Sequence, residues 1–535
     1  MTIPQVVDGV TDADAAFMNQ LVDAANQANA AFNGAGQITT AAITPALEGY
    51  GPLANMRAGI VNVLDSDDVA GDGVSDDTSG IASQLASLTS GGTLVFPAGS
   101  VYKGNPATRH VIPADCTVDA RGATLVDVLF EPRARSAIIG ARFTSAGVRT
   151  QKAIISTNND ETAVCIDQCI FDGFDSAVYL QGHTQTGEQQ QIGWSVTNSE
   201  FLNCSYPLLI IRGDRLLIEG NRFSGNVSGN IMFFGGSRSR VIGNDVDGGV
   251  TGIAFIYNRS TSGRFAPFLQ NLIASNRVAG FSEEGITFDV RGNSADNIGV
   301  VENGTVSATD VSGPTNRIEL GASGWGSSPE ALYYGYWAMF VTGALAGRVY
   351  RITSHPAGTG KFGFSDTDLA DAEYAAITVG DRVIIGMPAI GNTIVGNTVD
   401  CASSVSEAAE YDGAGIVHWG NAFYSSIVGN TVMGGEITLR SLEGLTTATG
   451  SYTGVSGKAP VMNCSVQGNT VYQGNIRFGF KGYGGFAGSP TYQSIGCIAG
   501  GNVVASGSMI ADAHQVVNAD NVADGLSTAN GGAFI

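Results

Sequence analysis

Side chains suited to acid–base chemistry and to binding a charged sugar fall on one side of a predicted run of strands. In GITFDV at 285–290 the alternation of apolar and polar residues turns Asp289, and Arg291 just after it, outward. Aligning the similar segments that begin at 415, 436 and 475 brings Trp419, Arg440 and Arg477 to the same side. We call these five residues the outer strip. They form either a binding surface or the ordinary solvated side of an exposed sheet.

The outer strip suits a sugar chain. An indole offers an apolar platform for a ring face, and guanidinium groups pair bidentately with carboxylate or sulfate substituents. Asp289 could act as a general acid or base. The predicted substrate-binding residues are Arg291, Trp419, Arg440, Arg477 and Lys481.

A glycoside hydrolase needs two carboxyl groups, about 5 to 5.5 Å apart for retention or roughly 6.5 to 9.5 Å apart for inversion. Glu284 precedes Asp289 by five residues, which is about 16 Å in an extended strand and on opposite faces, unless the chain bends at Gly285. Glu410 and Asp412, on the long loop before the segment that begins at 415, are alternative partners. The candidate catalytic residues are Asp289, Glu284, Asp412 and Glu410.

A polysaccharide lyase would use the same surface differently, with the arginines or Lys481 stabilising a uronate carboxylate, but no lyase-specific motif is present. His418 aligns with the inward Phe288 and is predicted to be a core residue. The acid-rich stretch at 65–77 fails the EF-hand template, because position 3 from Asp68 is Ala70. The cysteines show no metal-ligand spacing, so we expect no metal and no cofactor.

A repeat predicts the elements that position these residues. IEGNRF at 218–223 recurs as VIGNDV, IASNRV, IVGNTV twice and VQGNTV, with VENGTV at 301–306 and AGGNVV at 499–504 as less regular copies. A fixed core at variable spacing indicates rungs of a strand-turn-strand plan with loops of different length. The central Asn is expected in a tight turn with left-handed geometry, stacked as an amide ladder. Together with Gly-rich turns, this predicts an all-β parallel β-helix solenoid with two strands per rung.

The remaining segments complete a predicted domain plan. A helix is predicted at 12–32, within an N-terminal attachment or helical segment, 1–58. Farther along the chain the repeat is interrupted by a predicted small inserted β domain, which should overhang the outer strip. The plan is 1–58 N-terminal segment, 59–306 first part of the β-helix, 307–390 insert, 391–504 second part and 505–535 C-terminal tail.

Residues 65–99 read DSDDVAGDGVSDDTSGIASQLASLTSGGTLVFPAG. This stretch strongly resembles the entry signature of the pectate-lyase-like right-handed β-helix superfamily: a GDG-x-x-DDT turn, a short helix over the solenoid mouth, and a first strand GGT-x-x-FPAG. With the upstream segment, the layout resembles bacteriophage tailspike proteins. That resemblance implies a homotrimer in the virion, made in the host cytoplasm, that joins other tail proteins through its N-terminal segment and binds or cleaves a bacterial surface polysaccharide.

Charge and hydropathy narrow the function. A net charge of −21 argues against a nucleic-acid partner, which would need a basic face. No run of about 18 apolar residues is present, so no membrane insertion is expected. The sequence start has no apolar signal segment, which gives no support for secretion. We therefore predict a tailspike-like glycan depolymerase, with a non-catalytic spike or adhesin and a cellular polysaccharide lyase or epimerase as alternatives.

Overall fold

The computed structural model describes most of the chain after residue 58. The described residues are 59–147, 149–157, 162–181, 191–256, 267–290, 300–310, 316–321, 337–354, 360–365, 368–402, 414–440, 442–443, 458–459, 461–478, 496–512, 515–529 and 533–534. The predicted helix at 12–32 and the N-terminal segment 1–58 lie outside them.

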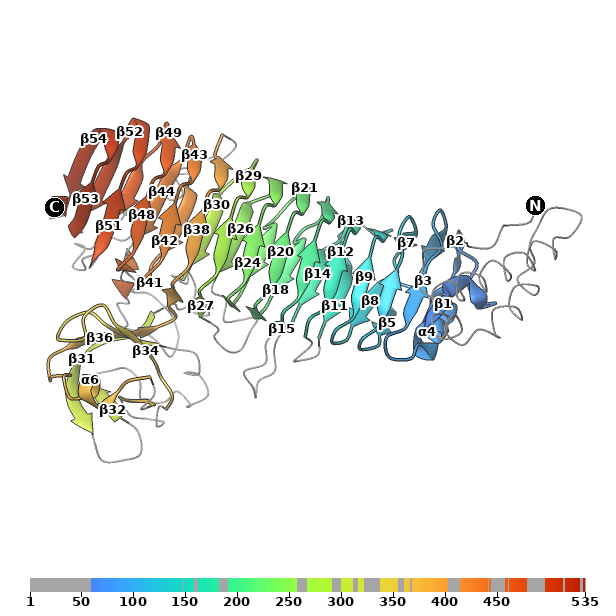
Figure 1. Cartoon of the computed structure of the whole chain (residues 1–535), viewed down its shortest axis with the longest axis horizontal. Coiled ribbons are helices and arrows are strands. Elements are labelled where there is room, and N and C mark those ends of the chain that lie inside the picture. Colours follow the sequence, from blue (N-terminus) through green and yellow to red (C-terminus); the bar gives the residue numbers. More distant parts are fainter. Residues whose placement is uncertain are drawn as a thin grey trace, which may run out of the picture.

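The described strands build a long solenoid in which each turn, or rung, stacks on the one before (Figure 1). One face is a parallel sheet of 15 strands, the first sheet. Its strands are β1 Ile60–Asn62, β3 Thr93–Val95, β6 Thr117–Asp119, β9 Ala137–Ile139, β12 Cys165–Asp167, β16 Ser195–Thr197, β20 Leu217–Glu219, β24 Arg240–Ile242, β28 Leu272–Ala274, β38 Thr393–Val395, β42 Ser426–Val428, β48 Ser465–Gln467, β51 Cys497–Gly500, β53 Gln515–Ala519 and β55 Ala533–Phe534.

A second parallel sheet of 25 strands has two columns, which join in the long strands β52 and β54. Column 1 contains β2 Asp72–Asp76, β4 Val101–Lys103, β7 Thr124–Val126, β10 Arg142–Thr144, β13 Ile170–Asp172, β17 Glu200–Leu202, β21 Arg222–Asn226, β25 Asp245–Gly248, β29 Arg277–Ala279, β39 Thr398–Asp400, β43 Thr431–Met433, β49 Thr470–Tyr472, β52 Val503–Asp512 and β54 Val522–Ala529. Column 2 contains β5 Arg109–Ile112, β8 Leu129–Pro132, β11 Lys152–Ser156, β14 Ser176–Leu180, β18 Leu208–Ile210, β22 Ile231–Phe233, β26 Thr251–Ile256, β30 Glu284–Asp289, β40 Ala414–Trp419, β44 Glu436–Arg440 and β50 Ile476–Phe478.

A third sheet closes the rung between column 2 and the next strand of the first sheet. The prediction of two strands per rung does not include this sheet, because its strands have only two residues each and carry no periodicity. They are β15 Gln191–Ile192, β19 Gly213–Asp214, β23 Gly236–Ser237, β27 Phe268–Leu269, β37 Ala389–Ile390, β41 Ala422–Phe423 and β47 Val461–Met462.

The repeated asparagines form the expected ladder between the first sheet and column 1. From Asn221 to Asn502 each side-chain Nδ2 donates to Oδ1 of the Asn on the next rung, at 2.9 Å for the first six steps. The prediction of left-handed geometry for these Asn residues is wrong. The preceding residue adopts it, as in Gly396 and Gly429, each with φ of +63°. Glycine suits that position because it carries no Cβ.

The interior is apolar and stacked from rung to rung. In column 2, Phe233, Phe255 and Phe288 stack in turn, with ring centroids 4.3 and 4.6 Å apart, and His418 continues the stack at 5.1 Å. The stack crosses the insertion that separates β30 from β40 in the sequence. The inserted residues therefore leave the rung spacing unchanged.

The insert has an antiparallel sheet of its own, shown below the later rungs in Figure 1. The assignment of VENGTV at 301–306 to the solenoid repeat is wrong, because β31 pairs antiparallel with β36 and β32. Alternation alone does not distinguish a solenoid strand from any other half-buried strand. The six strands are β31 Val300–Asp310, β32 Asn316–Leu320, β33 Trp337–Phe340, β34 Val349–Arg351, β35 Lys361–Phe364 and β36 Arg382–Gly386, with helix α6 Asp371–Tyr374.

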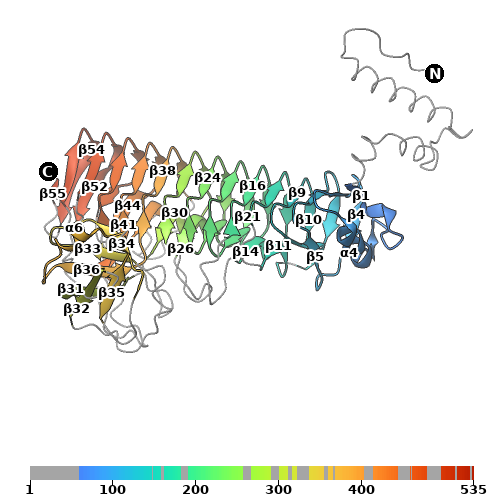
Figure 2. The same cartoon turned by 60° about the horizontal axis from the view of Figure 1, so that its bottom comes forward.

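The insert contacts the third sheet. Met339 and Ile384 of the insert pack on Phe423 and Met462 of β41 and β47. The backbone carbonyl of Gly347 accepts a hydrogen bond of 2.7 Å from the Tyr424 hydroxyl. Figure 2 shows the insert beside these later rungs.

The acid-rich entry segment is organised by backbone hydrogen bonds. The buried Asp77 carboxylate accepts from the backbone N–H groups of Ala70 and Lys103, and Asp76 accepts from the N–H of Thr78 at 3.0 Å. Asp77 is the N-cap residue of α4, Thr78–Ser87, and its side chain makes no capping hydrogen bond to the helix; the short 3-10 helix η1, Val63–Asp65, lies earlier in the segment. These carboxylates therefore hold the backbone of the entry turn.

Parallel pairing continues to the end of the described chain. β51 pairs with β53, and β53 with β55, so the segment predicted as a tail, 505–535, carries further rungs. A small antiparallel pair joins β45 Leu442–Glu443 to β46 Lys458–Ala459. Among the described residues, no helix has the length and apolar character needed to cross a membrane.

Candidate functional site

The backbone register places most of the outer strip as predicted. Asp289 of β30 lies opposite Trp419 of β40, and Trp419 lies opposite Arg440 of β44. Arg477 of β50 lies opposite Thr438, which is two residues before Arg440 and therefore on the same side of the sheet. Adjacent strands are about 4.8 Å apart, so these positions follow one another along the solenoid.

Glu284 lies on the same side of its strand as Asp289, because the strand departs from alternation at Gly285. A Cβ at Gly285 would lie 2.6 Å from Val399 Cγ1 and 3.1 Å from Phe281 Cε1, so this position faces the core, as does its neighbour Ile286. Two consecutive inward residues return Glu284 to the outer side. The expectation that Glu284 and Asp289 lie on opposite faces of the strand is therefore wrong. The chain departs from a regular strand at Gly285, the position where the sequence allowed a bend.

Trp419 connects the two carboxylate positions. Its backbone lies opposite Asp289, while its indole Nε1 donates a hydrogen bond of 2.5 Å to Glu284 Oε1. The prediction of an open ring platform is wrong, because Trp419 is 0% exposed although it does not belong to the solenoid core. The indole instead orients the Glu284 carboxyl.

The carboxylates themselves are largely withdrawn from solvent. Asp289 is 8% exposed and Glu284 is 4% exposed. The simple interpretation as solvated residues of an open sheet is therefore wrong for this pair. Carboxylates are costly to bury unless they are paired or hydrogen-bonded, and such groups are common in functional sites.

Glu436 of β44 is a third buried carboxylate, which the sequence analysis did not select. Asn475 Nδ2 donates to its Oε1 at 2.8 Å, and Arg477 Nε lies 3.6 Å from its Oε2. Arg477, predicted to bind substrate, is thus engaged by Glu436. The sequence could have indicated Glu436, because a glutamate also precedes the inward Ile of its segment. Glu436 comes directly before Ile437, as Glu284 comes before GIT.

The remaining predicted site residues cannot be placed by their side chains. Arg440 ends strand β44, and its position is known by backbone register alone. The other four, Arg291, Glu410, Asp412 and Lys481, lie outside the described residues.

His418 is a core residue, as predicted. Its ring stacks on Phe288, and complete burial lowers its pKa from the usual 6.5 to about 3. The imidazole is therefore neutral at physiological pH and faces away from the outer strip.

A family profile described as "Right handed beta helix region" matches residues 153–319. Together with the stacked parallel sheets, this match settles the architecture. The chain folds as a right-handed parallel β-helix. No curated protein sequence matches it.

Solved structures that resemble this β-helix include three with different functions. A mutant tailspike protein of E. coli bacteriophage HK620, in complex with a hexasaccharide, has 9% identity and a TM-score of 0.45, covering 90% of this chain and 79% of that one. The A-module of Azotobacter vinelandii mannuronan C-5 epimerase AlgE6 has 12% identity and a TM-score of 0.40, covering 88% and 97%. The Streptococcus pneumoniae surface adhesin PfbA has 11% identity and a TM-score of 0.38, covering 89% and 93%.

Proposed function

We propose that this β-helix binds and depolymerises a bacterial surface polysaccharide, capsule or O-antigen, at the outer side of β30, β40 and β44. The observation that carries the proposal is the gathering of three buried carboxylates: Glu284 and Asp289 on β30, and Glu436 on β44, with only β40 between those two strands. A solenoid needs no charged groups there to fold, because its stacking energy comes from the inward side chains.

The chemistry assigned to the site is glycoside hydrolysis. Glu284 and Asp289 act as the acid–base pair, one protonating the leaving oxygen and the other activating water, because five residues along one strand leave more room than the about 5 to 5.5 Å that direct attack on the anomeric carbon requires. Trp419 positions Glu284 through its indole N–H. Glu436, held by Asn475 and Arg477, borders the site one strand beyond Trp419.

The wider setting follows the sequence layout. We propose that the protein is a homotrimeric spike of a phage virion, made in the host cytoplasm, with residues 1–58 joining it to other tail proteins. The entry signature at 65–99 and the segment upstream of it support this placement. Light scattering of the purified full chain should give the mass of three copies, and a monomer would reject the trimer.

Incubating the purified chain with isolated capsule and O-polysaccharides tests the activity. Reducing ends and the ultraviolet absorbance of unsaturated uronates are followed together. We expect reducing ends without new absorbance. Both signals would replace the hydrolase with a lyase, and binding with neither signal would make the protein a non-catalytic adhesin.

A further inference from the structure

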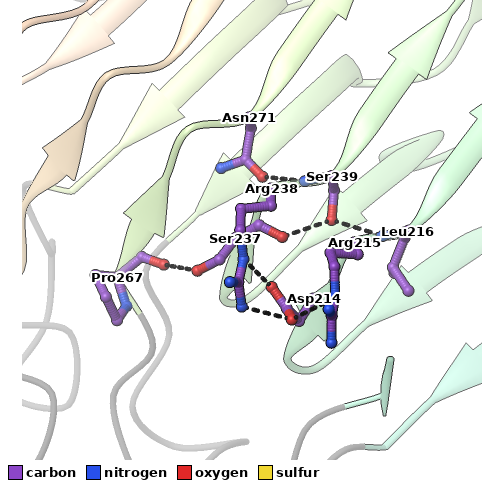
Figure 3. Close-up of polar contacts among 8 residues, drawn as sticks. All are labelled: Asp214, Arg215, Leu216, Ser237, Arg238, Ser239, Pro267 and Asn271. Carbon is purple, nitrogen blue, oxygen red and sulfur yellow. Dashed lines mark hydrogen bonds and ion pairs between the residues drawn. The ribbon is translucent and has the colours of Figure 1, made fainter. Parts of the chain in front are cut away.

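Two arginines stand on neighbouring rungs at the corner that follows the third sheet. β19 and β23 are paired in register, and Arg215 and Arg238 come directly after them (Figure 3). Both have left-handed backbones, with φ of +56° and +54°. Neighbouring rungs are about 4.8 Å apart, so two like charges are held close together by the fold.

A single buried carboxylate lies between them. Asp214, with a side chain only 3% exposed, accepts from Arg238 Nε at 2.8 Å and from Arg238 Nη2 at 2.6 Å. Arg215 Nε lies 3.2 Å from the same carboxylate, as the dashed lines in Figure 3 show. Two cations and one anion leave a local charge of +1 on a chain whose net charge is −21.

Three other exposed arginines of the described chain are each paired with a single carboxylate. Arg121 contacts Asp119, Arg135 contacts Asp115, and Arg277 contacts Asp245. At the Asp214 corner the ratio is two to one, and the side chains of Arg215 and Arg238 remain 59% and 54% exposed.

The two guanidinium groups keep donors available for a ligand. Each carries five N–H donors in a planar fork. Within the described part of the chain, Asp214 is the one side-chain acceptor that contacts them. Because Asp214 is buried and already holds both groups, it fixes their orientation while their other N–H groups face solvent.

We propose that Arg215 and Arg238 form an anion subsite that binds an acidic substituent, a carboxylate or a sulfate, of a glycan. A planar, doubly donating surface matches such groups better than a point charge does. The assignment to a glycan rests on the proposed function. Arg238 lies two rungs and Arg215 three rungs before the rung of Asp289, about 10 and 14 Å along the solenoid axis, within reach of one extended chain.

The neighbouring corner positions favour an extended ligand. Gln270, with φ of +54°, occupies the equivalent corner on the next rung. Gly193 and Gly391 occupy the corners at either end of this run of three side chains. The donors therefore form a short row bounded by residues without side chains.

The test measures binding of three hexasaccharides by calorimetry: an oligogalacturonate, a sulfated heparin fragment and neutral maltohexaose. We expect the wild-type chain to bind at least one acidic probe more than tenfold more tightly than maltohexaose. Because the heparin fragment carries carboxylates as well as sulfates, binding of the oligogalacturonate would show that carboxylates suffice, and binding of the heparin fragment alone would show that sulfate is required. Equal affinity for acidic and neutral probes would overturn the subsite.

The informative variant is Arg215→Gln, because Arg238 still holds Asp214 through two hydrogen bonds and the corner stays folded. We expect this variant to bind the acidic probe about tenfold more weakly. Arg277→Gln, which removes an arginine paired with Asp245, is the control and should bind the probe as the wild type does. Unchanged affinity in Arg215→Gln would reject the proposal. Cleavage is measured separately, on host polysaccharide. Binding of an acidic probe without cleavage would reject only the hydrolase. Cleavage without Arg215-dependent binding of an acidic probe would reject only the subsite.

Discussion

Two stretches of column 2 share their interior and differ on their outer side. From β14 to β26 the outward positions in one register are Tyr179, Leu209, Met232 and Ala254. From β30 to β50 the same register holds Thr287, Val417, Thr438 and Arg477, flanked by the carboxylates of Glu284, Asp289 and Glu436. Stacking constrains the inward residues, so we expect differences in function to depend on the outward residues.

The interior shows no such division. The inward register runs Leu180, Ile210, Phe233, Phe255, Phe288, His418, Leu439 and Phe478 across both stretches. The Asn ladder is equally continuous, since Asn276 bonds Asn397 across the insert. The interior is therefore common to both stretches, whereas their outward residues differ.

Removing a carboxylate from the later stretch should have the largest effect. We expect Asp289→Asn to lower cleavage of the host polysaccharide by about 10²- to 10⁴-fold, because general acid–base catalysis contributes on that scale. The melting temperature should stay close to that of the wild type. Glu219→Gln, an exposed carboxylate on the outer side of β20, serves as control and should keep full activity. Full activity in Asp289→Asn would remove it from the site.

Breaking the Asn ladder should harm both stretches alike. Asn430→Ala removes the acceptor for the Asn397 backbone N–H and the donor for the Ile394 carbonyl, and Asn221→Ala does the same for Ser199 and Val196. Each buried group left unpaired costs about 1–3 kcal/mol, so we expect a loss of about 3 kcal/mol in unfolding free energy. Denaturant unfolding measures it, and a neutral result in one stretch would contradict a common interior.

His110 and His418, which are buried in the described part of the chain, should make stability depend on pH. The folded-state pKa of His418, lowered to about 3 by burial, lies below its usual 6.5, so between those values only the unfolded chain takes up the proton. Falling pH therefore destabilises the fold by up to about 1.4 kcal/mol per pH unit in that window. We expect His418→Phe to reduce the difference in unfolding free energy between pH 7 and pH 5.

In that variant the unfolding free energy should still depend on pH because of His110 in β5, whose pKa is lowered by burial to about 4. The double variant with His110→Phe should flatten the profile further. An unchanged profile in His418→Phe would mean that this imidazole is not buried neutral.

The smallest effect is expected from Trp419→Phe, which removes the hydrogen bond to Glu284 but keeps an aromatic ring. We expect about tenfold slower cleavage, equivalent to about 1.4 kcal/mol, with little change in KM, because Glu284 is misoriented rather than lost. Trp194→Phe, in the core of the earlier stretch, should affect stability and leave cleavage unchanged. Equal loss of cleavage in both variants would mean that Trp419 acts only through folding.

The solenoid and its column 2 register could be predicted from the sequence because each rung repeats the same apolar and Asn positions. The register of Asp289, Trp419 and Arg440 followed directly from that repeat. Local departures from the regular alternation of inward and outward residues could not be predicted from the repeat. The inward Gly285, which brings Glu284 to the outer side, depends on contacts with Val399 and Phe281 on other strands.

Burial was the other property that the repeat could not supply. An outward position in a strand pattern is normally taken as exposed, yet Trp419 and Glu284 are buried outside the solenoid core. The corner of Arg215, Arg238 and Asp214 could not be predicted for a different reason: these residues meet through the third sheet, whose two-residue strands leave no pattern in the sequence.

A crystal structure of the Asp289→Asn variant with the longest oligosaccharide that wild-type digestion leaves would test the central claim most directly. The account predicts sugar density on the outer side of β30, β40 and β44, with one ring between residue 289 and Glu284. Density confined to the outer side of β14 to β26, or on the first sheet, would contradict the assignment of function to the later stretch.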